Sequence, residues 1–302
     1  MTVVRVVTPA FTAMGESPVW DVKSNRLYWV DVTEGVIFNA TPDGADVRIS
    51  VFPGHVTSLA LRRDGGAIVS SGTGLYAFDL QAGEAELLFD SGHGTGFSFN
   101  DGKTDRQGRF ITGMVDQALV SRAPSDHAGK PRPDTGLYRL DPDLSVTALG
   151  GGIGITNGPC FSPDGKRLYC NDSWARRIYV FDYHLVSGTP AHRHTFVEFE
   201  ADGPRPDGAT VDDEGCLWVA AFEGGEIRRY SPEGALDRRV PMPVLSPTSL
   251  TFGGSELDVL FVTSHGPAHV AGTVSDHRPL AGCVFAIHGL GAHGVPEELF
   301  SG

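Results

Sequence analysis

Residues 207–219 read Asp-Gly-Ala-Thr-Val-Asp-Asp-Glu-Gly-Cys-Leu-Trp-Val: a polar opening, an apolar run, an Asp-Glu-Gly turn and a second apolar run. Short runs of β-branched and aromatic residues between Gly and Asp turn signals are typical of antiparallel strands. The same order recurs along the whole chain. Five further copies start near residues 15, 57, 99, 156 and 248. The chain therefore consists of six similar units.

Each unit continues into a third apolar run, such as residues 74–78 and 177–181. The unit starts recur roughly every 40–50 residues, which is the spacing of β-propeller blades. We predict an all-β, six-bladed β-propeller that forms one domain over residues 1–302. A propeller ring has to close, and residues 3–7 (Val-Val-Arg-Val-Val) precede the first complete unit. We expect them to supply the outer strand of the last blade.

The composition supports a globular protein and argues against some partners. Hydrophobic residues make up 40% of the chain, which is ample for a large core, and charged residues only 20%. The net charge of −13 disfavours nucleic acid as a partner, because an acidic surface repels phosphate. No apolar run approaches the roughly 20 residues of a membrane span, and the N-terminus lacks a signal-peptide core. We expect a cytoplasmic protein with a small-molecule substrate and no membrane partner.

The third unit is longer than the others. It carries an insertion at about residues 117–134 that is rich in Pro, Ser, Ala and charged residues. Such a segment is either a surface loop without a further role or a lid at the mouth of the channel.

The first strand of each propeller blade lines the central channel, so residues at its start converge at one end of the ring. Glu16, Asn157 and Asp207 occupy this position, and Asn100 is a fourth candidate. Their carboxylate and amide oxygens suit Ca²⁺, Mg²⁺ or Mn²⁺, whereas Zn²⁺ more often recruits His or Cys. Asn-Gly and Asp-Gly are also ordinary turn sequences. The place of these residues in the repeat therefore leaves both a metal site and ordinary turns open.

Four motifs in fixed order carry a family resemblance. They are Gly-Glu-Ser-Pro-Val-Trp at 15–20, Phe-Asn-Asp-Gly-Lys at 99–103, Thr-Asn-Gly at 156–158 and Pro-Asp-Gly at 206–208. Asp105 and Arg109 extend the second motif, and residues 217–220 (Leu-Trp-Val-Ala) follow the fourth. Over roughly residues 14–265 the chain resembles the senescence-marker-protein/gluconolactonase family, which includes regucalcin, luciferin-regenerating enzyme and bacterial sugar lactonases.

The resemblance implies one divalent metal ion held by Glu16, Asn157 and Asp207, with Ca²⁺ expected first and Mg²⁺, Mn²⁺ or Zn²⁺ as alternatives. It also implies that Asn100 contacts the substrate or a water on the metal. The expected activity is that of a carboxylic ester hydrolase, in which metal-activated water opens a lactone to the hydroxy acid. Asp207 is the expected base. Asp101 is a weaker candidate, because it could instead orient the Asn100 loop.

The substrate side departs from the family pattern. Many sugar lactonases carry Arg at the position of Ser98, and a family Glu after the second strand of the third blade is missing, with Asp116 as an uncertain replacement. Loss of Arg removes five directed hydrogen-bond donors. We therefore expect a less polar lactone or ester than an aldonolactone.

Four further residues are candidates for contact with the substrate, because each lies near the predicted mouth of the channel: His55, Trp174, Phe222 and His265. Each is explained equally well by loop packing. Two functions compete with hydrolysis of a sugar-like lactone. One is a regulatory propeller that binds a divalent metal without turnover, and the other is hydrolysis of a non-sugar ester or lactone at the same metal.

Overall fold

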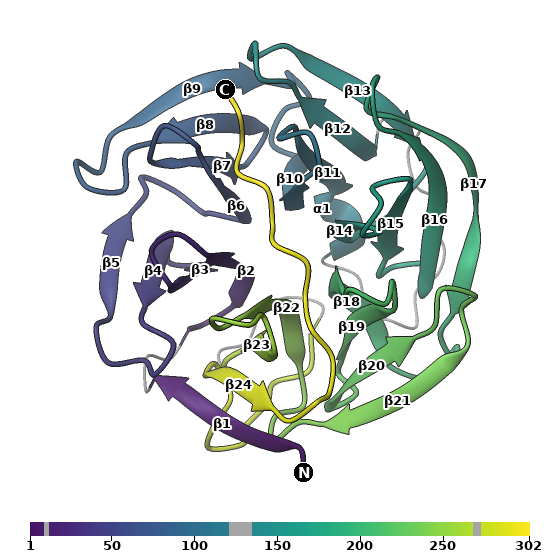
Figure 1. Ribbon diagram of the computed structural model, residues 1–302. Helices are drawn as coiled ribbons and strands as arrows, with labels where there is room; N and C mark the ends of the chain where they lie inside the picture. Colours follow the sequence, from purple (N-terminus) through teal and green to yellow (C-terminus); the bar gives the residue numbers. More distant parts are fainter. Residues whose placement is uncertain (9–11, 121–134, 268–272) are drawn as a thin grey trace.

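The computed structural model describes residues 1–8, 12–120, 135–267 and 273–302. Six four-stranded antiparallel sheets stand around a central channel, as Figure 1 shows. This confirms the predicted six-bladed β-propeller. Each blade begins with its innermost strand at the channel and ends with its outermost strand at the rim.

The strands of one type occupy equivalent places in the six blades. The innermost strands are β2 (Gly15–Asp21), β6 (Ser58–Leu61), β10 (Phe97–Thr104), β14 (Thr156–Phe161), β18 (Arg205–Val211) and β22 (Pro247–Gly253). The second strands are β3 (Arg26–Asp31), β7 (Ala67–Ser71), β11 (Phe110–Asp116), β15 (Arg167–Asp172), β19 (Leu217–Phe222) and β23 (Val259–Ser264). The third strands are β4 (Val36–Ala40), β8 (Gly74–Phe78), β12 (Gly136–Leu140), β16 (Arg177–His184), β20 (Glu226–Tyr230) and β24 (Val284–His288).

The outermost strands are β5 (Arg48–Val51), β9 (Ala85–Asp90), β13 (Val146–Gly151), β17 (Thr189–Glu198), β21 (Leu236–Pro241) and, in the sixth blade, β1 (Val3–Thr8). β1 pairs antiparallel with β24, with Val3 opposite His288 and Val6 opposite Phe285. The first strand of the chain thus completes the last blade, as predicted. One short helix, α1 (Gln117–Val120), follows β11 in the described part of the chain.

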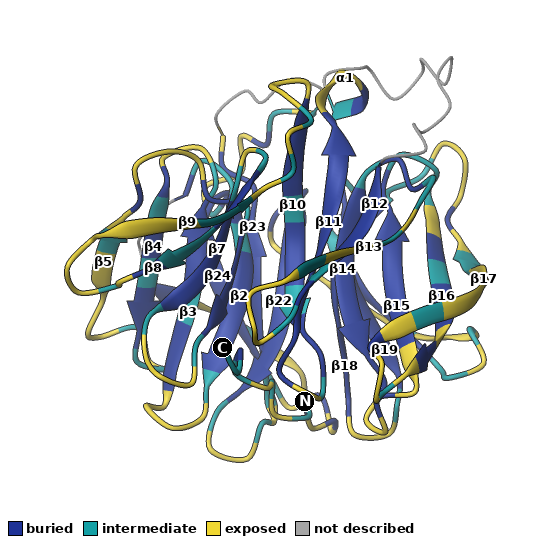
Figure 2. Cartoon of the chain, turned by 90° about the horizontal axis from the view of Figure 1, so that it is seen from above, coloured by how far each residue is buried: buried dark blue, intermediate teal, exposed yellow. Residues whose placement is uncertain are grey.

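The core lies between the blades rather than inside one sheet. In the described residues, an apolar cluster fills the space between each pair of neighbouring blades. Where the ring closes, Trp20 of the first blade stacks on Phe261 of the sixth, with ring centroids 5.4 Å apart. The inner strands are buried on both faces, while the outer strands are largely exposed (Figure 2). Burial on both faces explains the nearly continuous apolar runs in the sequence.

The C-terminal segment, residues 289–302, crosses the ring on the face opposite α1 (Figures 1 and 2). Phe300 is fully buried against the second and third blades. Glu297 forms an ion pair with Lys103 on β10 at 2.6 Å. It also accepts a hydrogen bond from Thr251 on β22 at 3.1 Å. β10 and β22 belong to opposite blades, so Glu297 spans this end of the channel. The opposite end, near α1, carries the candidate site described below.

The predicted insertion lies only partly within the described residues. Of the predicted insertion, residues 117–120 form α1, whereas residues 121–134 lie outside the described residues, so the lid stays a prediction. All four cysteines are buried free thiols. No helix among the described residues is long and apolar enough to cross a membrane.

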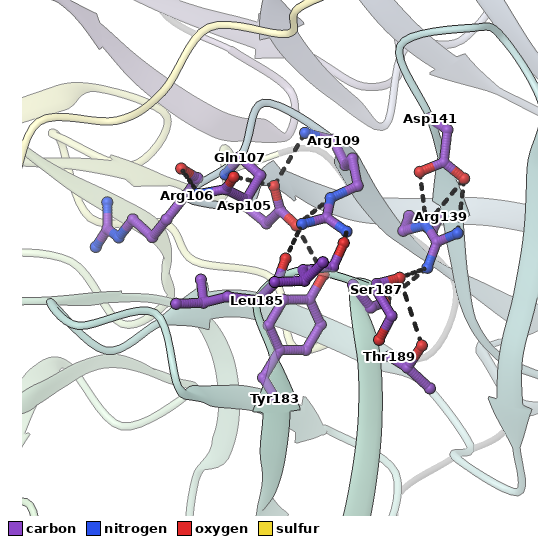
Figure 3. A network of polar contacts seen from close by, with 12 residues as sticks. Asp105, Arg106, Gln107, Arg109, Arg139, Asp141, Tyr183, Leu185, Ser187 and Thr189 are labelled. Carbon is purple, nitrogen blue, oxygen red and sulfur yellow. Dashed lines mark hydrogen bonds and ion pairs between the residues drawn. The ribbon is translucent and has the colours of Figure 1, made fainter.

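Asp105, a member of the second motif, joins the third and fourth blades (Figure 3). Its buried carboxylate pairs with Arg109 at 2.8 Å and accepts a hydrogen bond from Tyr183 Oη on β16 at 2.8 Å. Burial, followed by the charge of Asp105, raises the pKa of Tyr183. Arg109 also donates to the carbonyls of Leu185 and Val186, which fixes the loop after β16. This motif residue therefore has a structural role.

Replacing Asp105 should destabilise the fold strongly, because Arg109 would keep a buried charge without its carboxylate. We expect Asp105→Ala to lower the free energy of unfolding by about 3–5 kcal/mol. Urea denaturation followed by circular dichroism measures this difference. Asp182→Ala is the matched control, since Asp182 pairs with His192 at the surface, where such a pair contributes less than about 1 kcal/mol. Equal losses in the two variants would contradict the assignment.

Candidate functional site

A β-bulge interrupts five of the six innermost strands at the residues that face the channel mouth. The register shifts after Glu16 in β2, after Phe99 in β10, after Asn157 in β14, after Pro206 in β18 and after Pro247 in β22. A bulge redirects a side chain and locally ends the pairing of its strand. The candidate ligands Glu16, Asn157 and Asp207 therefore lie at bulges close to the start of their strands.

Close packing of neighbouring blades explains the glycines after two of these residues. A Cβ at Gly158 would lie 2.7 Å from the backbone nitrogen of Ala209, and Gly158 has a positive φ of 51°. A Cβ at Gly208 would lie 2.1 Å from Ser249 Oγ. Only glycine fits where one inner strand approaches the next so closely. The Asn-Gly and Asp-Gly pairs thus belong to the channel wall and are not ordinary hairpin turns.

These side chains line one pocket at the channel mouth, with a volume of about 120 Å³. Its polar lining residues are Glu16, Asn100, Asn157, Ser173, Arg205, Asp207, Thr248 and Thr273. Its apolar lining includes Met14, Val32, Ile155 and Phe222. The structure therefore brings together all three predicted metal ligands and Asn100, from the first, third, fourth and fifth blades.

A chain of hydrogen bonds fixes the orientation of both amides. Ser173 Oγ donates to the carbonyl of Pro206 at 2.6 Å, so this hydroxyl accepts the bond from Asn157 Nδ2 at 2.9 Å. Asn157 Oδ1 consequently points the other way, where it accepts a bond from Asn100 Nδ2 at 2.7 Å. Asn100 Nδ2 also donates to the carbonyl of Thr156 at 2.8 Å, which leaves Asn100 Oδ1 as an acceptor.

The two carboxylates of the pocket disfavour each other's charge. Burial raises the pKa of Glu16 well above its ordinary value, and the charges of Asp207 and Asp101 raise it further. Burial also raises the pKa of Asp207, with a contribution from Asp101, whereas the positive charge of Arg205 lowers it. Two buried carboxylates of like charge are stable as anions only beside a compensating cation.

This donor set fits a hard divalent cation. Glu16 and Asp207 supply carboxylate oxygens, and Asn157 Oδ1 has a second lone pair beyond its bond to Asn100. In the described residues, a second set of potential metal ligands lie close to one another: Asp212, Glu214 and Cys216. There, however, Asp212 receives two bonds from Arg229, at 2.9 and 2.7 Å. The guanidinium already supplies the counter-charge at Asp212, so we assign a structural role to that group.

Asp101 lies beside the pocket but is not among its lining residues. Both of its carboxylate oxygens accept backbone bonds at 2.8 Å, one from Gly102 and one from Gly158 on the next blade. These bonds hold the Asn100 bulge against the Asn157 bulge, which favours the orienting role over that of a base.

The remaining predicted substrate residues lie outside the described pocket lining, except for Phe222. Ser98 is buried and its hydroxyl donates to the carbonyl of Phe99 at 2.7 Å. Asp116 is buried and accepts a bond from Ala118 at the start of α1. His55 Nδ1 contacts the carbonyl of Thr33 at 3.0 Å, Trp174 packs beside Gly154, and His265 packs edge-on against Phe222. Direct contact of these five with a substrate stays a prediction.

The sequence interpretation missed Arg205, Ser173 and Asn171. Arg205 lines the pocket directly before Pro206 and Asp207. Asn171 Nδ2 donates to the carbonyl of Asp207, and Ser173 holds that of Pro206. Arg205 could have been found from its place beside the motif. Asn171 on β15 and Ser173 just after it could not have been found from the sequence, because their contacts depend on how neighbouring blades pack.

The whole chain has counterparts among known proteins. A model of the SMP-30/gluconolactonase/LRE-like region matches residues 14–266. The chain belongs to this family. A 6-deoxy-6-sulfogluconolactonase from Pseudomonas putida is 34% identical over 293 residues, covering 96% of both chains. A regucalcin from Oryctolagus cuniculus is 33% identical over 302 residues, covering 99% of this chain and 98% of that protein. The solved structure of a luciferin-regenerating enzyme has a TM-score of 0.89 and 27% identity, covering 100% of both chains.

These findings confirm the family inferred from the four motifs. They also agree with the expected enzyme class, because the family includes lactone-hydrolysing esterases.

The raised pKa values predict how the stability of the metal-free protein depends on pH. Glu16 and Asp207 retain protons in the folded state that the unfolded chain releases above their ordinary pKa values of 4.5 and 3.8. The free energy of unfolding should therefore fall as pH rises above these ordinary values. The fall is about 1.4 kcal/mol per pH unit for each proton that the folded state still retains. Saturating Ca²⁺ should oppose this fall, because the cation compensates the charges.

Urea denaturation between pH 4 and 8, with chelator or with Ca²⁺, measures this dependence. The control is the Glu16→Gln, Asp207→Asn double variant, in which both titrations are removed and the pH dependence should flatten. An identical pH dependence of the wild type and the double variant would rule out these two groups as its source.

Ser173 is predicted to position Asn157 for metal binding. We expect Ser173→Ala to weaken Ca²⁺ binding about 10–100-fold while the protein stays folded, because Asn157 loses the bond that directs its oxygen into the pocket. Calorimetric titration after chelator treatment measures the affinity. Ser145→Ala is the matched control, because Ser145 lies in an exposed turn and its hydroxyl bonds with the side chain of Asp143, far from the pocket lining. Unchanged affinity in Ser173→Ala would contradict the role of this relay.

Proposed function

We propose that this protein is a metal-dependent lactonase that opens a small lactone to its hydroxy acid. The observation that carries the proposal is the convergence of Glu16, Asn157 and Asp207 on one pocket. Asp207 is buried and Glu16 partly buried there, and a cation would compensate their like charges. The lactonase relative, which matches 96% of this chain, supports the reaction class.

The three oxygen donors would hold one divalent ion, with Ca²⁺ preferred for a set of carboxylate and amide oxygens. When bound, such an ion polarises an ester carbonyl and lowers the pKa of a water molecule. Glu16 and Asn157 serve in this proposal as ligands only. The pocket volume of about 120 Å³ suits a substrate with a single ring.

Asp207 would accept a proton from the attacking water, because its carboxylate lines the pocket beside the position of the ion. Asn100 would accept a hydrogen bond from the water or from a substrate hydroxyl through Oδ1, since its Nδ2 is directed to Thr156 and Asn157. The apolar side chains of Met14, Val32 and Ile155 would exclude bulk water from the ring.

The likeness to regucalcin supports a second candidate, a propeller that binds metal without turnover. Both candidates need the same ligands, so only an assay of turnover separates them. Hydrolysis of a non-sugar ester is a third outcome of the same assay.

Acid release from a panel of γ- and δ-lactones, measured after metal removal and stepwise return of Ca²⁺, Mg²⁺, Mn²⁺ or Zn²⁺, tests the proposal. We expect hydrolysis to stop without metal and to return with it. Asp207→Ala should lower kcat/KM by about 10²–10⁴-fold while the protein stays folded, because the base is lost together with a ligand.

Asp213→Ala is the matched control, since Asp213 is an exposed turn residue that follows the same strand and should leave activity intact. Metal binding without hydrolysis of any lactone would favour the non-enzymatic candidate. Full activity of Asp207→Ala, or hydrolysis that persists with chelator, would contradict the mechanism.

A further inference from the structure

We infer that Arg205 determines substrate specificity by binding an anionic substituent on the lactone, such as a carboxylate or sulfonate, away from the ester that is cleaved. The inference rests on the proposed lactonase function and names the substrate class of that site. It replaces the expectation of a less polar lactone, which rested on Ser98, because the Ser98 side chain is turned to its own backbone and lies outside the pocket lining.

Arg205 is the one cationic side chain among the described lining residues. It opens β18, two residues before Asp207, so it reaches the pocket from the fifth blade, whereas Ser98 belongs to the third. Its side chain is only 14% exposed. A guanidinium in such a place forms stronger bonds with an anion than a solvated one does, because little water screens the charge.

The guanidinium is held in place by neighbours on two sides. Its Cζ lies 5.0 Å from the centre of the Phe222 ring, and Phe222 in turn packs edge-on against His265. Its Nη2 pairs with Glu223 Oε1 at 3.0 Å, and the backbone nitrogen of Val274 donates to the same oxygen at 2.9 Å. Stacking and pairing reduce the entropy that the side chain would lose on binding a ligand.

The surroundings favour an anion over a neutral hydroxyl. Burial lowers the pKa of Arg176, and the nearby positive charge of Arg205 lowers it further. The negative charges of Glu223 and the exposed Asp202 act in the opposite direction. Arg176 also donates to the carbonyls of Gly203 and Pro204, which anchors the backbone that leads into Arg205. Arg205 is thus paired with the partly buried Glu223, and Arg176 adds a second positive charge nearby. A substrate anion would supply the second negative charge.

Two lactones that differ only in the group under test provide the probes. D-Glucaro-1,4-lactone carries a carboxylate where D-glucono-1,4-lactone carries a hydroxymethyl group, and the rings are the same. For the metal-loaded wild type we expect kcat/KM at least about tenfold higher for the anionic lactone. Arg205→Gln should lower this ratio about tenfold or more, through a higher KM for the anionic lactone. Arg205→Lys should lower the ratio less, because lysine keeps the positive charge but lacks the planar pair of N–H donors.

Arg5→Gln is the matched control, since Arg5 lies exposed on β1 and should leave the ratio unchanged. Circular dichroism melts of all variants separate loss of specificity from loss of folding. A wild-type preference for the neutral lactone overturns the inference. So does a preference for the anion that persists in Arg205→Gln, because the metal would then be its source.

Failure of the proposed function gives a different result. If neither lactone is hydrolysed with any metal, the same pair is titrated into the metal-loaded protein by calorimetry. Tighter binding of the anionic lactone that Arg205→Gln abolishes would uphold the role of Arg205 while refuting hydrolysis. Equal binding of the two lactones would overturn both.

Discussion

Two carboxylates of like charge meet at the mouth of the channel, where Asp207 is buried and Glu16 is partly buried. The charge of Asp207 makes ionisation of Glu16 less favourable. Such an arrangement persists only because the packed blades impose it and a cation can relieve it. The bulges direct these side chains into the pocket, and the backbone bonds of Asp101 hold two of the bulges together. The hydrogen-bond relay through Ser173 then supplies a neutral oxygen ligand of defined orientation.

The two ends of the central channel are built differently. At the far end of the channel, Glu297 joins the inner strands of two opposite blades, and the C-terminal segment crosses that face. At the near end, the proposed metal ligands and Arg205 line the same pocket, and Arg205 contacts Phe222 and Glu223. The pocket thus has one part suited to polarising an ester and another suited to selecting the molecule that carries it.

Six blades and ring closure by residues 3–7 could be predicted because each blade has the same succession of strands and turns. Glu16, Asn157 and Asp207 stood out by their place in that succession, and the family motifs singled them out from ordinary turns. The role of Ser173 depends on which carbonyl the next blade presents, a contact without local sequence signal. Arg205 was visible beside its motif, but the direction of its side chain is set by Phe222 and Glu223 on the adjoining strand and loop.

The central claim is that Glu16, Asn157 and Asp207 form the metal centre. Anomalous diffraction from crystals soaked in Mn²⁺ tests it most directly, because the ion reports its own position. The account predicts a peak within bonding distance of Glu16, Asn157 and Asp207 that disappears in crystals of the Glu16→Gln, Asp207→Asn variant. A peak at Asp212, Glu214 and Cys216 with none at the channel mouth, or no peak at either place, would contradict it.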